Sequence, residues 1–328
     1  MPLVSVIVPH LRGSDLLVAC LNSLRAQTCQ NLEVILVDNG STDGSLELVR
    51  QRYQEVRVLA LGENRGFAAA CNRGVEAARG DLLWFLNDDA RAATDCLDHL
   101  LQAARRFADA GSFAPRMLRA TQPGVVDNRG IGFSVFGAGY QLGAGEDDDA
   151  SVTEPYLVFG ASGGAALYRR SVLETVGGFD EDFLSHNEDT DLAFRAQLAG
   201  YPCWHVPRAV VYHVGAATTP ASSDETVYRV QRNMELTFWQ NMPGALLVKY
   251  GLPHLAYSLA WLLYLALRGH GLAALRARAD ALAAWRTIGR KRRLRQMHRQ
   301  VKARYVDSLL TWHLGVSVAR RKGEFTGA

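Results

Sequence analysis

The fold is decided by the stretch Leu82-Leu83-Trp84-Phe85-Leu86-Asn87-Asp88-Asp89. Five apolar residues form a run of strand length, and an amide and two adjacent carboxylates end it. A strand that is apolar throughout is buried on both faces, and open α/β sheets bind ligands at the carboxyl ends of such strands. Two carboxylates there suit a hard divalent cation, and Mg²⁺ or Mn²⁺ in turn suits a diphosphate. A solvated turn after a strand would show the same pattern.

The segments around this strand alternate in kind. Apolar runs predict strands at 3–9, 33–38 and 56–61, and amphipathic or capped segments predict helices at 14–24, 45–53 and 67–78. Further on, ordered structure is predicted at 156–170, a helix at 189–198 and a short strand at 209–213. This alternation predicts an α/β fold with a mostly parallel, Rossmann-like sheet flanked by helices.

Residues 120–150 differ in composition from the segments around them. They are rich in Gly, contain few aliphatic residues and end in the acidic run 146–149. No apolar strand leads into that run. We therefore expect a solvated loop, placed over the active site, rather than a metal site.

The composition is that of a globular protein with a sizeable core, at 328 residues, 48% hydrophobic and 21% charged. The net charge of +3 conceals an asymmetry. Residues 268–322 hold 15 Lys and Arg against two Asp, whereas residues 1–267 hold 21 basic and 30 acidic residues. The five scattered cysteines form no C-x-x-C pair, and a strand pattern starts at once with no apparent signal peptide. Both observations favour a reducing, cytoplasmic location.

Beyond residue 225 the pattern becomes helical. The apolar stretch 252–267 has 16 residues, which is short for a membrane span of about 20. Segments 272–285 and 290–304 mix Ala and Leu with Arg, as in helices that lie in a membrane interface. We expect an anionic membrane surface as partner of this region; a helical subdomain with a solvated basic face is the alternative. We expect no nucleic-acid partner. The predicted organisation is a catalytic domain over 1–224, with halves 1–90 and 91–224, and a C-terminal region over 225–328.

Two nucleotide-binding classes lack their sequence fingerprint. No G-x-G-x-x-G follows the first strand or occurs elsewhere, and no G-x-x-x-x-G-K-[ST] occurs. This counts against an NAD-type oxidoreductase and a P-loop protein. A phosphate group must then be held in another way, and a metal bound by Asp88 and Asp89 would hold it.

Several separate motifs follow one another in a fixed order. They are Val4–Pro9, Val37-Asp38-Asn39-Gly40-Ser41-Thr42-Asp43-Gly44-Ser45, Glu63–Ala68 with Asn72, Asn87-Asp88-Asp89, Gly177-Gly178-Phe179-Asp180-Glu181, Glu188-Asp189-Thr190-Asp191-Leu192 with Arg195, and His213. Together they resemble a family 2 glycosyltransferase of the GT-A fold, of the rhamnosyltransferase-like kind, over roughly residues 3–240. The turn His10-Leu11-Arg12-Gly13 departs from the Asn-Trp/Tyr-Asn type that relatives often have.

The resemblance implies a nucleotide site. Asp38 would accept a hydrogen bond from the imide N–H of uracil or thymine, and Arg65 would face the phosphates. Asp38 as the cap of the following turn, and Arg65 as a surface side chain, are the alternatives. Further donor contacts are implied for Pro9, Asn39, Asn72, Asn87 and Asp88, although Asn72 on a helix would also fit a packing role.

The resemblance also implies the chemistry. Asp89 and His213 would bind Mg²⁺ or Mn²⁺, Asp189 would be the general base, and its neighbour Glu188 would position base or acceptor. Asp180 would reach the acceptor or the donor sugar. Acids at 188–191 also suit a helix N-terminus, where the dipole favours negative charge.

The expected function is metal-dependent, inverting transfer of a sugar to a hydroxyl of a lipid-linked or polysaccharide acceptor. The expected donor is dTDP-rhamnose, followed by a UDP-hexose. The expected location is the inner face of the cell membrane, held peripherally. A protein that binds nucleotide-sugar without turnover is the alternative.

Overall fold

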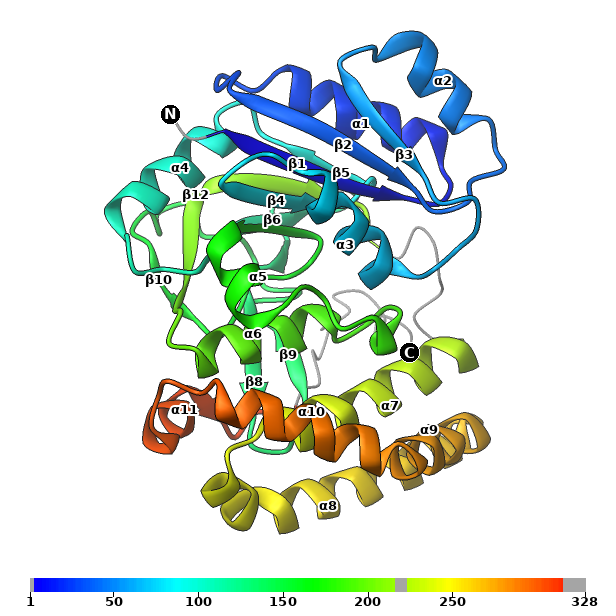
Figure 1. Ribbon diagram of the computed structural model, residues 1–328, viewed down its shortest axis with the longest axis vertical. Coiled ribbons are helices and arrows are strands. Elements are labelled where there is room, and N and C mark those ends of the chain that lie inside the picture. Colours follow the sequence, from blue (N-terminus) through cyan, green and yellow to red (C-terminus); the bar gives the residue numbers. More distant parts are fainter. Residues whose placement is uncertain (1–2, 216–222, 315–328) are drawn as a thin grey trace, which may run out of the picture.

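The computed structural model describes residues 3–215 and 223–314 (Figure 1). Its first part alternates strand and helix, as predicted. The elements are β1 (Val4–His10), α1 (Ser14–Arg25), β2 (Leu32–Asp38), α2 (Ser45–Arg52), β3 (Val56–Ala60), α3 (Phe67–Ala77) and β4 (Leu82–Leu86). The strands β4, β1, β2 and β3 are parallel neighbours in that order. Since His10 pairs with Asp38, β1 and β2 end at the same edge of the sheet.

The second part completes a sheet of ten strands. It comprises β5 (Ala90–Ala92), α4 (Cys96–Arg106), β6 (Ser112–Arg119), β7 (Val126–Asn128), β10 (Tyr156–Val158), β11 (Ala165–Arg169) and β12 (Cys203–His213). β11 lies antiparallel between β4 and β6, whereas β6 and β12 are parallel. The predicted α/β fold with flanking helices is confirmed, and the sheet is mixed because β5, β7, β10 and β11 all pair antiparallel.

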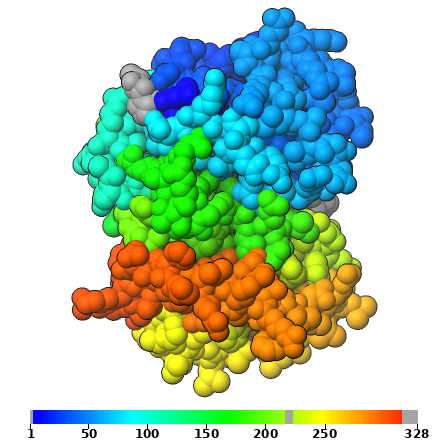
Figure 2. Space-filling view, viewed as in Figure 1, coloured from blue at the N-terminus to red at the C-terminus, as the bar shows by residue number. Residues whose placement is uncertain are grey.

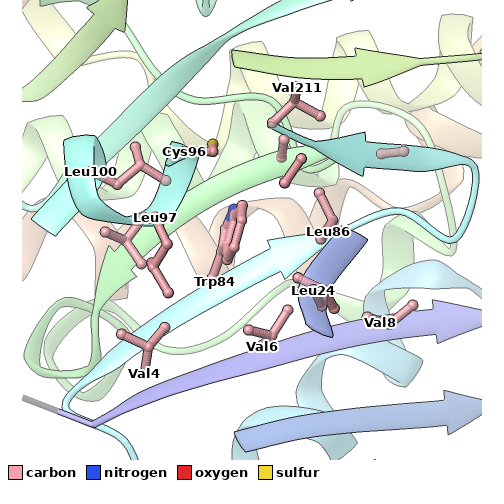
Figure 3. Packing of buried hydrophobic residues seen from close by; sticks show 14 of the residues in the cluster. Val4, Val6, Val8, Leu24, Trp84, Leu86, Cys96, Leu97, Leu100 and Val211 are labelled. Atoms are coloured by element: carbon pink, nitrogen blue, oxygen red, sulfur yellow. The ribbon is translucent and has the colours of Figure 1, made fainter. Parts of the chain in front are cut away.

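Residues on β4 explain why its sequence is apolar throughout. Trp84 belongs to a core cluster with Val4, Val6 and Val8 of β1, which α1 and α4 cover on one face (Figure 3). Phe85 belongs to the cluster on the opposite face, with Ile7 and residues of α3. All five residues of β4 are buried. The polar residues that follow it are therefore held at the sheet edge by a strand fixed on both sides.

The acidic run 146–149 lies in a loop and is largely exposed, as predicted, but the glycine-rich segment before it is not a single loop. It contains β7, β8 (Ile131–Ser134) and β9 (Gly139–Gln141), and β8 pairs with β9 and with β13 (Leu310–Thr311). The glycines permit close packing, since a Cβ on Gly132 would lie 2.3 Å from the Tyr140 ring. The acidic run is also attached to the body, because Arg116 pairs with Asp148 at 3.3 Å.

The remaining elements are helical. They are α5 (Arg170–Val176), the 3₁₀ turn η1 (Glu181–Phe183), α6 (Glu188–Leu198), α7 (Asp224–Asn241), α8 (Gly244–Leu267), α9 (Gly271–Ala283), α10 (Trp285–Met297) and α11 (Ala303–Leu309). Helices α7 to α11 form a layer below the sheet (Figure 1). Among residues 3–215 and 223–314, no helix has the length and hydropathy to cross a membrane. The basic residues 320–322 lie outside the described part of the chain.

Candidate active site

A cleft of about 340 Å³ opens at the carboxyl ends of β1, β2 and β4. Its walls come from these strand ends, from the start of α3, from the segment before α6 and from the start of α7. The lining residues include Pro9, His10, Asn39, Phe67, Asn87, Asp88, Asp89, Ser185, His186, His213, Thr226 and Arg229. Six of the predicted site residues are among them: Pro9, Asn39, Asn87, Asp88, Asp89 and His213.

Asp89 and His213 face each other in this cleft. His213 is the last residue of β12 and pairs in register with Ala90 of β5, which places it beside Asp89. Its Nε2 lies 3.1 Å from Asp89 Oδ1. Burial alone would lower the pKa of His213, but hydrogen bonds to Asp127 and Asp89, and their charges, outweigh it and raise the pKa to about 10. Burial likewise opposes ionisation of Asp89, yet the His213 contact lowers the pKa of Asp89 below its usual value.

Asp127 is a site residue that the sequence analysis missed. It lies on β7, and its Oδ2 is 2.9 Å from Nδ1 of His213. A carboxylate on one ring nitrogen fixes the orientation of the imidazole and leaves the other nitrogen for a ligand. No local signal marks Asp127, because β7 has only three residues and lies inside the glycine-rich segment.

The two facing side chains fit a divalent cation. Two ligands in adjacent octahedral positions, each about 2.1 Å from Mg²⁺ or Mn²⁺, lie about 3 Å apart, and Asp89 and His213 are separated by 3.1 Å. Among the described residues no group of three or more His, Cys, Asp and Glu side chains gathers as a metal site. Mg²⁺ is typically held by one or two protein ligands together with substrate phosphates and water. A pair of ligands is therefore sufficient for a metal that arrives with a diphosphate.

Asp88 belongs to a chain of buried polar contacts. Nδ1 of His10 lies 2.6 Å from Asp88 Oδ2, and Nε2 lies 2.7 Å from Ser45 Oγ. Ser45 Oγ donates to Asp43 Oδ1 at 2.5 Å, and this bond lowers the pKa of Asp43 to about 2. Since the single Ser45 hydrogen goes to Asp43, Nε2 of His10 must donate to Ser45. The unusual His10 thus orients Asp88 toward the cleft.

Asp189 and Glu188 begin α6 beside the cleft. Asp189 Oδ2 accepts a hydrogen bond from the Gly163 amide at 2.9 Å. A Cβ on Gly163 would touch both Asp189 and the cleft residue Phe67, so these side chains are close neighbours. Glu188 is buried, and its Oε2 has no hydrogen-bond partner in the part of the chain that the structure describes. Burial, and then the charge of Asp189, raise the pKa of Glu188 well above its usual value.

The backbone before α6 is strained. Leu184, His186 and Asn187 all have positive φ, at 60°, 68° and 65°. Non-glycine residues adopt such angles only where surrounding contacts enforce them. Asn233 of α7 supplies these contacts, since its Nδ2 lies 2.9, 3.0 and 2.8 Å from the carbonyl oxygens of Phe183, Ser185 and His186. The strained segment thereby presents Ser185 and His186 to the cleft.

Three predicted donor contacts have other partners. Asp38 is buried and its Oδ1 accepts from the Ser41 amide, so it caps the turn after β2. Arg65 is half exposed and pairs with Glu63 at 3.2 Å. Asn72 holds the Phe179 backbone, because its Nδ2 donates to the carbonyl oxygen at 2.9 Å and its Oδ1 accepts from the amide at 2.8 Å. None of these side chains lines the cleft.

Asp180 lies in a different place from the other predicted residues. Its carboxylate pairs with Lys291 at 2.5 Å and with Arg295 at 2.8 Å, both from α10. Together they line a cavity of about 430 Å³ between α10 and the turn after α5. That cavity is larger than the cleft, but its charged side chains Asp180, Arg195, Lys291 and Arg295 are all engaged in ion pairs. A direct sugar contact by Asp180 is therefore not favoured by its position. Asp191 pairs with Arg195 at 2.8 Å.

Two family models match the chain. The one described as Glycosyl transferase family 2 matches residues 5–177, more than half of the chain. The one described as Glycosyl transferase family group 2 matches residues 149–275. The chain therefore belongs to glycosyltransferase family 2, and it is a glycosyltransferase.

Similar proteins agree with this assignment. The N-acetylglucosaminyl-diphospho-decaprenol L-rhamnosyltransferase of Mycobacterium tuberculosis is 33% identical over 229 residues, which cover 62% of this chain and 74% of the relative. The mannosyltransferase PcManGT of Pyrobaculum calidifontis, solved with GDP-Man and Mn²⁺, superposes with a TM-score of 0.56 at 22% identity, over 86% of this chain and 76% of that one. GalNAc-T7, solved with UDP, GalNAc and Mn²⁺, gives 0.60 at 15% identity, over 73% and 48%. These likenesses confirm the predicted GT-A fold.

Proposed function

We propose that this glycosyltransferase moves L-rhamnose from dTDP-rhamnose to a hydroxyl of a lipid-linked or polysaccharide acceptor, with inversion and with Mg²⁺ or Mn²⁺. The observation that carries the proposal is the Asp89–His213 pair, 3.1 Å apart in the cleft of a family 2 chain. The similarity to a rhamnosyltransferase supports the choice of sugar. A UDP-hexose is the alternative donor, since uracil and thymine carry the same imide N–H group.

The proposed donor site lies along the strand ends. Asp89 and His213 would hold the metal, which offsets the charge of the leaving nucleoside diphosphate when bound. Asn87 and Asp88 would face ribose and sugar, and His10 keeps Asp88 in place. The side-chain oxygen of Asn39 accepts a hydrogen bond from the backbone amide of Arg65 at 2.8 Å, which anchors the 64–66 segment. The Arg65 side chain would reach a phosphate by leaving its exposed ion pair with Glu63. Backbone at Pro9 would contact the base.

The proposed acceptor side is the start of α6. Asp189 would take the proton from the attacking hydroxyl, which then adds to the anomeric carbon opposite the leaving diphosphate. No covalent intermediate is needed. Burial, and then the charge of Asp189, raise the pKa of Glu188 well above its usual value, so Glu188 is poorly suited to act as an ionised general base. A general base must be ionised to act.

The proposed setting is the inner face of a cell membrane. Lipid-linked acceptors are confined to a bilayer, and the segment 268–314 holds twelve Lys and Arg against two Asp. Residues 225–328 would form the membrane-associated region, and residues 1–224 the catalytic one.

Calorimetric titration of dTDP, UDP and GDP, each with and without Mn²⁺, tests the donor and metal assignments. We expect metal-dependent binding of dTDP, or of UDP if the alternative donor is used. Metal-independent binding would remove Asp89 and His213 from the metal site. Absence of binding by the folded protein would refute the proposal.

Asp189→Asn separates binding from chemistry. The variant should bind nucleotide as the wild type does and lose transfer by about a hundredfold or more, because the amide cannot accept the proton. The matched control is Asp180→Asn, whose carboxylate lies away from the cleft. Transfer at the wild-type rate by Asp189→Asn would refute the base assignment. Nucleotide binding without any transfer by the wild type, with all acceptors offered, would favour the silent binding protein.

A further inference from the structure

Helix α8 has two contrasting faces. One face packs on the body through Leu246, Tyr250, His254, Ser258 and Leu265, all of them buried. On the other face, every exposed residue between 252 and 267 is Leu, Ala or Tyr. An exposed helix face is normally polar, so the apolar character of this face indicates a surface that contacts a partner.

The exposed leucines form a continuous stripe, which we call the α8 stripe: Leu252, Leu255, Leu259, Leu263 and Leu267. Their spacing of three and four residues keeps them within an arc of about 120° on the helix. Leu252 is 79% exposed and Leu267 is 89% exposed. Of the twenty large hydrophobic side chains that are exposed in the described residues, fifteen lie between Val248 and Leu314, so the apolar surface is concentrated in this one layer.

The α8 helix is fixed in its orientation. Glu235 of α7 accepts hydrogen bonds from Ser258 at 2.6 Å and lies 2.9 Å from Nε2 of His254. Arg278 of α9 donates to the Ser258 carbonyl at 2.7 Å. These buried contacts hold α8 along the surface of the protein. The stripe can thus meet a flat apolar layer lengthwise without any rearrangement.

The charge around the stripe identifies its partner. Residues 244–314 hold thirteen Lys and Arg against only Asp280 and Asp307. Both acids are engaged, Asp280 with Tyr228 and Asp307 with Lys249. A second copy of this surface would bring basic groups against basic groups. An anionic lipid layer offers both an apolar interior and negative headgroups.

We propose that the α8 stripe, with Leu272, Leu275 and Leu282 of α9, docks flat into the interface of an anionic membrane. This inference refines the membrane setting of the proposed function, since it names the surface and its orientation. Lys249 and Arg268 flank the stripe at its two ends, and Arg276 and Arg286 lie on the exposed side of α9 and at the start of α10. In Figures 1 and 2 this layer forms the lower edge of the molecule, at the opposite end from α2.

The docking surface is connected to the cleft by α7. The start of α7 contributes Thr226 and Arg229 to the cleft, and α9 packs along the same helix. A sugar carried on a membrane lipid would therefore approach along α7 toward the base-bearing start of α6. The nucleotide side of the cleft, at the ends of β1 and β2, lies farther from the docking layer (Figure 1).

Sedimentation of the full chain with vesicles tests the docking surface without any donor or acceptor. The vesicles contain phosphatidylglycerol and phosphatidylcholine in equal parts, or phosphatidylcholine alone. The double variant Leu255→Glu/Leu259→Glu should lower partition into the anionic vesicles by about tenfold or more. Leu157→Glu is the matched control, because Leu157 is 56% exposed on β10, against 52% for Leu255 and 58% for Leu259. It should bind like the wild type.

A second pair of substitutions separates the electrostatic contribution to vesicle binding from the apolar contribution. Arg268→Gln and Arg286→Gln should each lower partition roughly fivefold at low salt, and added salt should reduce that difference. All variants should keep the nucleotide affinity of the wild type, which shows that they fold. The proposal is overturned if the wild-type protein does not bind anionic vesicles. It is also overturned if the protein forms dimers in solution that the Leu255→Glu/Leu259→Glu variant dissociates. If the docking proposal is wrong, the protein does not bind vesicles but still binds nucleotide. If the proposed function is wrong, the protein does not bind nucleotide but still binds vesicles.

Discussion

At the scale of single residues, His213 shows how one side chain depends on its neighbours. Its Nε2 faces Asp89 and its Nδ1 faces Asp127, at 3.1 and 2.9 Å. If Nε2 is the metal ligand, then Asp127 decides which nitrogen is free and where the ring points. Outer carboxylates of this kind are worth about ten- to a hundredfold in metal affinity.

Asp127→Asn should therefore weaken Mn²⁺-dependent nucleotide binding by about tenfold or more while leaving the fold unchanged. The amide keeps the size of the side chain but no longer supplies a charge to the imidazole. Calorimetric titration of the nucleotide at several Mn²⁺ concentrations measures the effect. Asp147→Asn, in the nearby acidic run, is the control. Equal affinities for Asp127→Asn and wild type would show that Asp127 does not act through His213.

The sequence predicted some of these residues and missed others for a physical reason. Asp88 and Asp89 end a buried strand, so local pattern alone indicates the sheet edge. Asp127 carries no such signal, and His10 follows a predicted strand but was named only as part of a turn that departs from the usual type. Asp127 reaches His213 across 86 positions of sequence through β7, β6 and β12, a pairing that only the folded sheet creates. Asp180 fits a motif, but its carboxylate is taken by α10, which the motif does not reveal.

At the scale of elements, the strained segment before α6 depends on one residue of α7. Asn233→Ala should lower the free energy of unfolding by about 1–3 kcal/mol, because three carbonyl oxygens lose their donor. It should also lower kcat, since relaxed φ angles move His186 and the start of α6. Urea denaturation and transfer assays at saturating donor measure the two effects. The control is Gln240→Ala, also a buried residue of α7, because the Gln240 amide has no hydrogen-bond partner among residues 3–215 and 223–314. A similar loss of kcat in both variants would contradict this account.

The network that clamps α8 to α7 predicts a pH dependence. Burial alone would raise the pKa of Glu235, but hydrogen bonds from His254, Ser258 and Trp239, with the charge of His254, lower it from 4.5 to about 2. A depressed folded-state pKa stabilises the protein above the unfolded value. This contribution is complete above pH 4.5 and is lost as the pH falls toward 2.

Glu235→Gln should remove that contribution, on the order of 3 kcal/mol, and flatten the pH dependence of stability in this window. Urea denaturation of both proteins at a series of pH values tests it. Glu225→Gln, an exposed acid on the same helix, should change stability little. If the free energy of unfolding of Glu235→Gln falls with pH as steeply as that of the wild type, other carboxylates cause the loss of stability in acid.

Local pattern predicted the first half of the fold more completely than the second. From β1 to β4 each strand and helix carries its own apolar period, and the order of elements follows from it. The placement of β11 between β4 and β6 depends on which strands pair with each other over long distances in the sequence. The residues of β11 alone do not determine this pairing. The short strands β7 to β9 were missed because each has only three or four residues, and because glycine takes one position in β8 and in β9.

At the scale of the whole molecule, the catalytic part and the C-terminal helices share a core. One buried cluster joins Phe133, Phe159 and Phe194 with Phe238 of α7 and Val306 of α11. The boundary at 224/225 therefore separates two stretches of sequence that contribute to the same cluster. We infer that the two regions fold as one cooperative unit, and that neither keeps its core when expressed without the other.

Arg295 of α10 gives a direct test of this unity. It donates to Asp191 at 2.5 Å and to Asp180 at 2.8 Å, and Asp191 has no exposed surface. Arg295→Met keeps much of the apolar volume and removes the charge, so buried Asp191 keeps only Arg195 as its ion-pair partner. The free energy of unfolding should fall by about 3 kcal/mol or more, whereas exposed Arg293→Met should change it by about 0.5 kcal/mol or less. Denaturation followed by both tryptophan fluorescence and circular dichroism should show one coincident transition in each protein. Two separate transitions, or equal stabilities of the two variants, would mean that the C-terminal helices are attached to the catalytic part without stabilising it.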